Sequence, residues 1–192
     1  MSAFTLKLIA LVTMIIDHVG AIFFPQFIWL RYIGRLSMPI YAFLLVQGYM
    51  HTRNFNRYAL RMGIFALLSE VPYDLLFQGT WLEFQRQNIL FTFLTALFVV
   101  KLLDASAKSR NIFMFIGAVI LTILPYFLHF SYGVYGVLTV LCFYLFQKYR
   151  GIDAVAFAAL TYGQYTQDGN MTQLYAIAAA IPVLLYNGKR GA

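Results

Sequence analysis

The chain has 192 residues, of which 61% are hydrophobic and 11% are charged, and its formal net charge is +7. Its mean hydropathy is +0.73. A soluble domain carries about 25% charged residues, so the composition excludes an ordinary soluble protein. The single cysteine, Cys142, excludes an intrachain disulfide and a cysteine-based metal site, and we expect no bound metal.

Apolar runs of transmembrane length follow one another along the chain and predict an all-α integral membrane protein. We expect one polytopic membrane domain over residues 1–192 with about eight transmembrane helices and short loops. In chain order the predicted spans cover residues 5–24, 28–49, 59–77, 87–103, 111–129, 132–147, 152–165 and 171–187. The first apolar run has no cleavage site of small residues after it, so we interpret it as a retained span. The seventh span is short and ends in a polar turn, which leaves a tilted or re-entrant segment open.

Basic residues gather after every second predicted span, and the intervening loops hold few of them. The basic residues are Arg53, Arg57, Arg61, Lys101, Lys108, Arg110, Lys148, Arg150, Lys189 and Arg190. This is the positive-inside pattern and not a nucleic-acid-binding stripe. With an even number of spans, it predicts that both termini are cytoplasmic in a multi-pass protein of the inner or plasma membrane.

Ionisable residues of both signs fall in the predicted outer half of the membrane, on four consecutive spans. They are Asp17, His18, Arg31, Arg35, Glu70 and Asp74, together with the amide Asn88. Ionisable groups at membrane depth are costly and indicate a functional site by default. A structural ion pair between Arg35 and Glu70 or Asp74, which would lock the second and third spans together, is the alternative for those residues.

A second group of polar residues, all basic or neutral, falls at the cytoplasmic end. It comprises Lys7, His51, Arg53, Arg57 and Arg61, with Lys101 as a further candidate, and the resemblance described below adds Gln47 as a sixth predicted donor-binding residue. Cations without matching acids suit a phosphorylated cytosolic ligand, although anionic lipid headgroups would suit them as well. Ten residues separate Lys7 from His18, which places the two side chains on one helix face about 16 Å apart.

Four blocks of the sequence are similar to the TraX family of membrane proteins. They are LKLIALVTMIIDHVG, YIGRLSMPIYAFLLVQGYMHTRN, RYALRMGIFALLSEVPYDLLF and QNILFTFLTALF, and together they cover roughly residues 5–100. The second half matches mainly in being hydrophobic, with SYGVYGV as its best local match. The spacing of Lys7 and His18 also resembles the basic residue and histidine, ten residues apart, of membrane acyltransferases that modify sugars and lipids.

The namesake of the TraX family acetylates the amino terminus of conjugative F pilin, so the resemblance implies acetyl transfer from acetyl-CoA. The acceptor would be a peptide or protein amine or another small molecule, and membrane lipids would surround the protein. The matching positions are Asp17, His18, Gly34, Arg35, Pro39, Gln47, Gly48, His51, Thr52, Arg53, Asn54, Glu70, Pro72 and Asn88.

This resemblance and the depths of the polar residues together suggest roles for them. His18 would be the general base, with Asp17 fixing its tautomer or the neighbouring geometry. Arg35 or Asn88 would stabilise the oxyanion. Glu70 and Asp74 would hold an ammonium group, and the cytoplasmic group would bind the CoA thioester.

Two other functions are possible for a membrane protein with this sequence. A small proton- or ion-coupled transporter would employ the buried charges as its path. A purely structural membrane partner would not need those charges at one depth. Thermal stabilisation by CoA or acetyl-CoA distinguishes the enzyme from the transporter.

Overall fold

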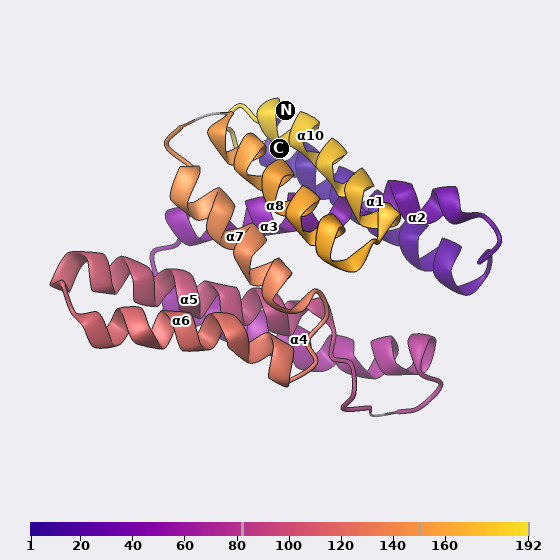
Figure 1. Cartoon of the computed structure of the whole chain (residues 1–192), viewed down its shortest axis with the longest axis horizontal. Helices are drawn as coiled ribbons and strands as arrows, with labels where there is room; N and C mark the ends of the chain where they lie inside the picture. Colours follow the sequence, from indigo (N-terminus) through magenta and orange to yellow (C-terminus); the bar gives the residue numbers. More distant parts are fainter. Residues whose placement is uncertain (82, 150, 192) are drawn as a thin grey trace. The chain divides into compact units, whose positions relative to one another are not determined.

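The computed structural model describes residues 1–81, 83–149 and 151–191, and this part of the chain is helical throughout (Figure 1). The helices are α1 (Ala3–Ile22), α2 (Ile28–Gly34), α3 (Ser37–His51), α4 (Phe55–Phe77), α5 (Ile89–Ser109), α6 (Ile112–Phe127), α7 (Gly133–Phe146), α8 (Ile152–Asp168), α9 (Met171–Leu174), the 3₁₀ helix η1 (Tyr175–Ala179) and α10 (Ala180–Leu184). Extended pairing in the described ranges is limited to an isolated bridge between Gln87 and Phe130. The all-α prediction is confirmed. Arg150, one of the basic residues used to predict orientation, lies outside the described residues.

The helices form two compact units. The first contains Met1–Leu44 and Cys142–Ala192, and the second contains Leu45–Leu141, so α3 and α7 each contribute to both. In the first unit the Phe43 ring packs edge-on against Phe143. In the second unit α5 packs against both α4 and α6, and seven of its residues are buried. The single-domain organisation stays a prediction.

The predicted second span is two helices, because the chain breaks between α2 and α3. Proline at position 39 has no N–H to donate to the carbonyl of Arg35, and its ring would clash with that carbonyl. The helix therefore ends at Gly34, Arg35 and Leu36 form a turn, and Pro39 lies in the first turn of α3, where proline is tolerated. The predicted eighth span is interrupted in a similar way, with a 3₁₀ segment just before Pro182.

The two ends of the chain are hydrogen-bonded to each other in the first unit (Figure 1). The N–H of Ala3 donates to the carbonyl of Lys189 at 2.9 Å, and the N–H of Asn187 donates to the carbonyl of Met1 at 2.9 Å. The termini therefore lie side by side.

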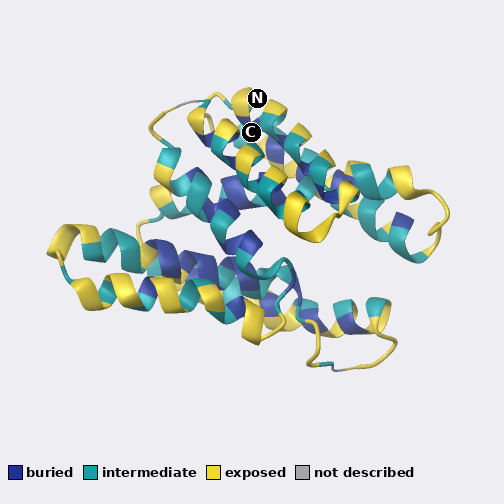
Figure 2. Ribbon diagram, in the orientation of Figure 1, coloured by how far each residue is buried: buried dark blue, intermediate teal, exposed yellow. Residues whose placement is uncertain are grey.

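Exposed residues occur on many of the helices (Figure 2). Large apolar side chains are numerous among them, while several polar side chains are buried. On α4 the exposed residues include Leu60, Phe65, Leu67 and Leu68, and on α6 they include Ile112, Phe113, Ile120 and Phe127. Exposed apolar area of this extent marks a membrane or protein interaction surface. Two described helices, α1 and α5, are long and apolar enough to cross a bilayer. The fold is thus that of a membrane-associated helical protein, and the eight-span topology stays a prediction.

Candidate functional site

An ion pair joins α1 to α2 in the first unit. Arg31 Nη1 donates to Asp17 Oδ2 at 3.0 Å and to the Asp17 carbonyl at 3.2 Å. Gly34 makes the close packing possible, because a Cβ there would lie 2.2 Å from the Cβ of Asp17. The other carboxylate oxygen, Asp17 Oδ1, is buried and accepts no hydrogen bond from the described residues.

His18 is oriented by its own helix. Its Nδ1 lies 2.7 Å from the carbonyl oxygen of Met14. A carbonyl oxygen only accepts, so Nδ1 must carry the hydrogen, and in the neutral imidazole the lone pair is on Nε2. In the structure the Met14 carbonyl fixes the tautomer of His18, and Asp17 pairs with Arg31. The other expected role of Asp17, which is to fix the geometry around His18, stays a prediction. A ring that presents a basic Nε2 has the form needed for a general base.

Arg35 lies at the turn between α2 and α3, in the first unit. Its predicted partners Glu70 and Asp74 belong to the second unit, so the ion pair between the second and third predicted spans stays a prediction. The single cluster of all seven outer polar residues also stays a prediction.

Glu70 and Asn88 are joined by two hydrogen bonds in the second unit. Glu70 Oε2 accepts hydrogen bonds from the backbone N–H of Asn88, at 3.1 Å, and from Asn88 Nδ2. Asn88 Nδ2 also donates to the Ala66 carbonyl at 2.8 Å, and Asn88 Oδ1 caps α5 by accepting from the N–H of Leu90. Both amide hydrogens of Asn88 are thereby used. Asn88 therefore fits the role of positioning Glu70, and it fits the role of a donor to an oxyanion less well.

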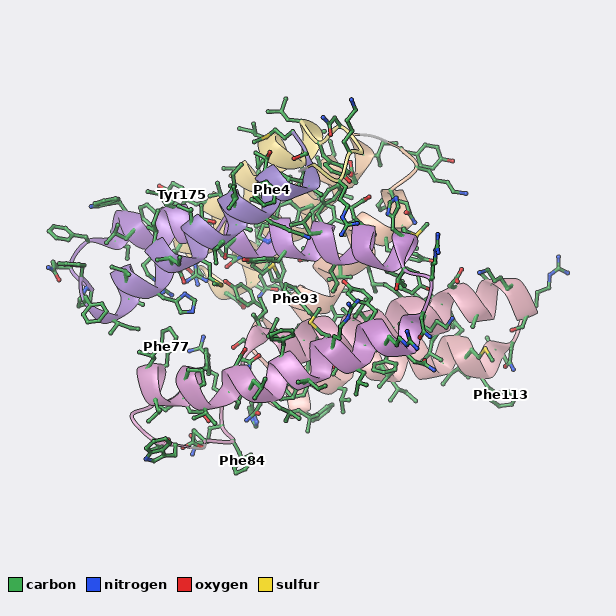
Figure 3. The ribbon with its side chains drawn as sticks, turned by 180° about the vertical axis from the view of Figure 1, so that it is seen from behind. Phe4, Phe77, Phe84, Phe93, Phe113 and Tyr175 are labelled. Carbon is green, nitrogen blue, oxygen red and sulfur yellow. The ribbon has the colours of Figure 1, made fainter. Side chains whose placement is uncertain are left out.

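Asp74 lies one helical turn after Glu70 and is fully buried. Its Oδ2 accepts a hydrogen bond from the N–H of Glu83 at 2.8 Å, and its relative exposure is 0%. Pro72 lies between the two carboxylates without interrupting α4. Figure 3 labels Phe77 and Phe84 at this end of α4 and in the loop that follows it.

Three hydroxyl groups fix the start of α5, where Asn88 lies. Ser131 Oγ donates to the Gln87 carbonyl at 2.7 Å, Thr92 Oγ1 donates to the Ser131 carbonyl at 2.6 Å, and the Tyr73 and Ser131 hydroxyls are 3.2 Å apart. Sequence reasoning missed these residues. A hydroxyl on an apolar helix usually bonds to its own backbone, so no local signal distinguished them.

Basic residues of the predicted cytoplasmic group gather where α3 ends and α4 begins. His51, Arg53, Arg57 and Arg61 are exposed there, and Gln47 is half-buried. His51 Nδ1 lies 2.8 Å from the carbonyl of Gln47. The structure therefore brings five of the six predicted residues to one end of the second unit. Lys7 is exposed in the first unit, and its membership of the group stays a prediction.

Two hydrogen bonds and one close approach at a glycine stabilise the connection between α3 and α4. The side chain of Asn54 caps α4 by accepting from the N–H of Arg57 at 3.0 Å. The hydroxyl of Tyr58 donates to the Leu45 carbonyl at 3.4 Å. A Cβ at position 48 would come within 2.6 Å of that hydroxyl, so Gly48 allows Tyr58 to pack against α3. Arg57 and Arg61 are thus presented from an ordered helix start.

The chain matches one protein family and is similar to two known proteins. The model of the TraX protein family matches residues 2–192. The chain is 28% identical over 177 residues to a probable fimbrial assembly protein, FimC of serogroup H1, from Dichelobacter nodosus, and the match covers 84% of this chain and 69% of that protein. It is 31% identical over 85 residues to an uncharacterized protein of Rickettsia prowazekii (strain Madrid E), which covers 44% of this chain and 31% of that protein. No solved structure matches the chain.

Proposed function

This chain belongs to the TraX family, and from that premise we propose that it is an integral membrane acetyltransferase. It transfers the acetyl group of cytosolic acetyl-CoA to an amine that is reached from the outer side of the inner or plasma membrane. The acceptor is a peptide or protein amino terminus, of the pilin type, or a small amine. A relative named as a probable fimbrial assembly protein supports an acceptor of this kind.

The observation that carries the proposal is the state of His18. Its Nδ1 is engaged by the Met14 carbonyl, so Nε2 is the basic nitrogen. In the proposed step, Nε2 accepts a proton from the acceptor amine as the nitrogen attacks the thioester carbonyl. The carbon–sulfur bond breaks, the proton passes to the CoA thiolate, and the products are the acetylated amine and CoA.

Arg35 is the proposed oxyanion stabiliser, because a guanidinium group can donate to the charge that develops on the thioester oxygen. Asp17, which directly precedes His18 in the sequence, forms an ion pair with Arg31. This pair holds α2 against α1. Direct transfer to the amine and a relay through acetyl-His18 use the same base, so both remain within the proposal.

The donor binds through the basic residues at the start of α4. CoA carries phosphate groups, and exposed guanidinium groups bind phosphate with charge-assisted hydrogen bonds. Arg53, Arg57 and Arg61 supply these groups, and Gln47 and His51 complete the proposed donor site in the second unit. The part of Lys7, which belongs to the first unit, in donor binding stays an expectation from the sequence.

The proposed topology has eight spans with both termini in the cytoplasm. The apolar faces of α4 and α6 support it, because a bilayer would cover them. The adjacent termini support an even number of crossings. Acetyl-CoA is a cytosolic donor, so this topology places the basic group on the side where the donor is available.

The direct test uses the purified full chain with acetyl-CoA and a short peptide that has a free amino terminus. His18→Ala is expected to abolish acetylation of the peptide. His129→Asn is the matched control, because His129 has φ +53 and asparagine tolerates that conformation. Full acetyl transfer by the His18 variant would rule out His18 as the base.

A proton- or ion-coupled transporter is the second candidate, favoured by the buried carboxylates of Glu70 and Asp74. Binding of CoA separates the two functions. The enzyme is expected to unfold at a higher temperature in the presence of CoA, because a ligand that binds the folded state stabilises it. A transporter unrelated to acyl transfer would show no such increase.

A further inference from the structure

Glu70 and Asp74 are each engaged through one carboxylate oxygen only. Glu70 Oε2 is held by Asn88, and Asp74 Oδ2 is held by the N–H of Glu83. The other oxygens, Glu70 Oε1 and Asp74 Oδ1, are buried and accept no hydrogen bond from any residue that the structure describes. A buried acceptor without a donor is costly, and more so if it is charged. Two such atoms one helical turn apart can accept hydrogen bonds from one shared donor.

The charges of Glu70 and Asp74 also favour a cationic partner. The exposed fractions are 6% for Glu70 and 0% for Asp74, and the i, i+4 spacing places both carboxylates on one face of α4. Among the residues that the structure describes, Glu70 and Asp74 form no ion pair, in contrast to Asp17, which pairs with Arg31, and Asp104, which pairs with Lys108. Two neighbouring buried carboxylates repel each other, so a cation between them would relieve the repulsion and the desolvation together.

The geometry selects among cations. A planar guanidinium group binds best to both oxygens of one carboxylate, but each of these carboxylates has one oxygen already in use. Divalent cations need more ligands than two single oxygens, and no group of three or more metal-binding side chains occurs among the described residues. A primary ammonium group has three N–H donors on one atom and can donate to two separate oxygens.

We propose that Glu70 and Asp74 form a binding site for a primary ammonium group, with Asn88 as the positioning residue that turns Glu70 Oε1 toward the ligand. The proposal deepens the acetyltransferase assignment and rests on it, since the charged form of the acceptor amine is the species that binds. The bound ammonium group releases one proton to solvent before its nitrogen attacks the thioester, and His18 accepts the second proton during the attack. The site selects a primary amine over hydroxyl acceptors and over amines that are already acetylated.

The test measures binding without catalysis. The full chain, purified in detergent, is titrated calorimetrically with alanyl-glycyl-glycine amide and with the same peptide acetylated at its amino terminus. The peptide with the free amine is expected to bind, and the acetylated peptide is not. Glu70→Gln and Asp74→Asn, which keep the side-chain shape, are expected to weaken binding at least about tenfold. Asp104→Asn is the control, because it removes a carboxylate of the same unit that pairs with Lys108.

Equal binding of both peptides would overturn the proposal, as would unchanged binding in both folded variants. Either result would mean that the pair holds only a shared proton or an internal cation. If a variant fails to fold, the comparison of the two peptides on the unaltered chain still decides. CoA-induced stabilisation, measured on the same samples, tests the assignment separately: binding of the free amine without any effect of CoA would retain the ammonium site and reject the acetyltransferase.

Discussion

Asn88 holds Glu70 through two donors at once, its backbone N–H and its side-chain Nδ2, while it also caps α5. One buried residue thus links the middle of α4 to the start of α5 and leaves a single oxygen of Glu70 for another partner. The pair combines a structural role with a positioning role, and each can be tested.

Replacing Asn88 is expected to destabilise the second unit strongly. Asn88→Ala removes the cap of α5 and the side-chain donor to Glu70 and to the Ala66 carbonyl, while the backbone N–H at position 88 still donates to Glu70. We expect a loss of about 2–4 kcal/mol in the free energy of unfolding, measured by denaturation in mixed detergent. Asn111 caps α6 through its side chain alone, so Asn111→Ala is the control, with an expected loss of about 1 kcal/mol. Equal losses in the two variants would contradict the role given to Asn88.

Enlarging Gly34 is expected to separate α1 from α2. A Cβ at this position would lie 2.2 Å from both Cβ and Oδ1 of Asp17, and neither atom is the end of a long, flexible side chain. Gly34→Ala should lower the free energy of unfolding by about 1–3 kcal/mol and weaken the Arg31–Asp17 pair.

Gly163 provides the matched control within α8. Nothing lies within 4 Å of a Cβ built there. Gly163→Ala should therefore be neutral or stabilise the protein by about 0.5–1 kcal/mol, as alanine does in a helix. If the two glycine variants were equally stable, close packing at Gly34 would have no energetic importance.

Removing charge at the start of α4 is expected to weaken donor binding. The double variant Arg57→Ala with Arg61→Ala should bind CoA at least about tenfold more weakly, because two charge-assisted contacts to phosphate are lost. The measurement is the CoA-induced increase in unfolding temperature at low ionic strength, where exposed charges are least screened. Lys148→Ala removes an exposed cation elsewhere and should leave that increase unchanged. If CoA raised the unfolding temperature of the double variant by the same amount, the donor would not bind at the start of α4.

The predicted topology can be tested with single cysteines, since the chain has only Cys142. In a Cys142→Ser background, a cysteine at Gln85 is expected to react with a membrane-impermeant maleimide in intact cells whose inner membrane is accessible. A cysteine at Asn56 or Asn187 is expected to react only after the membrane is permeabilised. Labelling of all three positions from one side would exclude the eight-span orientation.

Parts of the site were predictable because they depend on neighbours in the sequence. The spacing of Glu70 and Asp74 by one turn places both on one helix face, and the run from His51 to Arg61 places its cations at one helix start. The hydrogen-bond acceptor of His18 was not predictable in the same way. Its own helix supplies the Met14 carbonyl, and nothing in the residue types showed that this carbonyl, and not Asp17, would orient the ring.

The sequence by itself determined that the chain is helical, apolar and related to the TraX family, because hydrophobic patterning, helix length and motif order are properties of short segments. It also placed ionisable residues within apolar helices. Only the tertiary structure decided which groups meet: Arg31 pairs with Asp17 where α2 packs on α1, and Asn88 engages Glu70 where α5 packs on α4. These pairings depend on the register of one helix against another and on glycines such as Gly34 that permit close approach, and such contacts leave no periodic trace in the sequence.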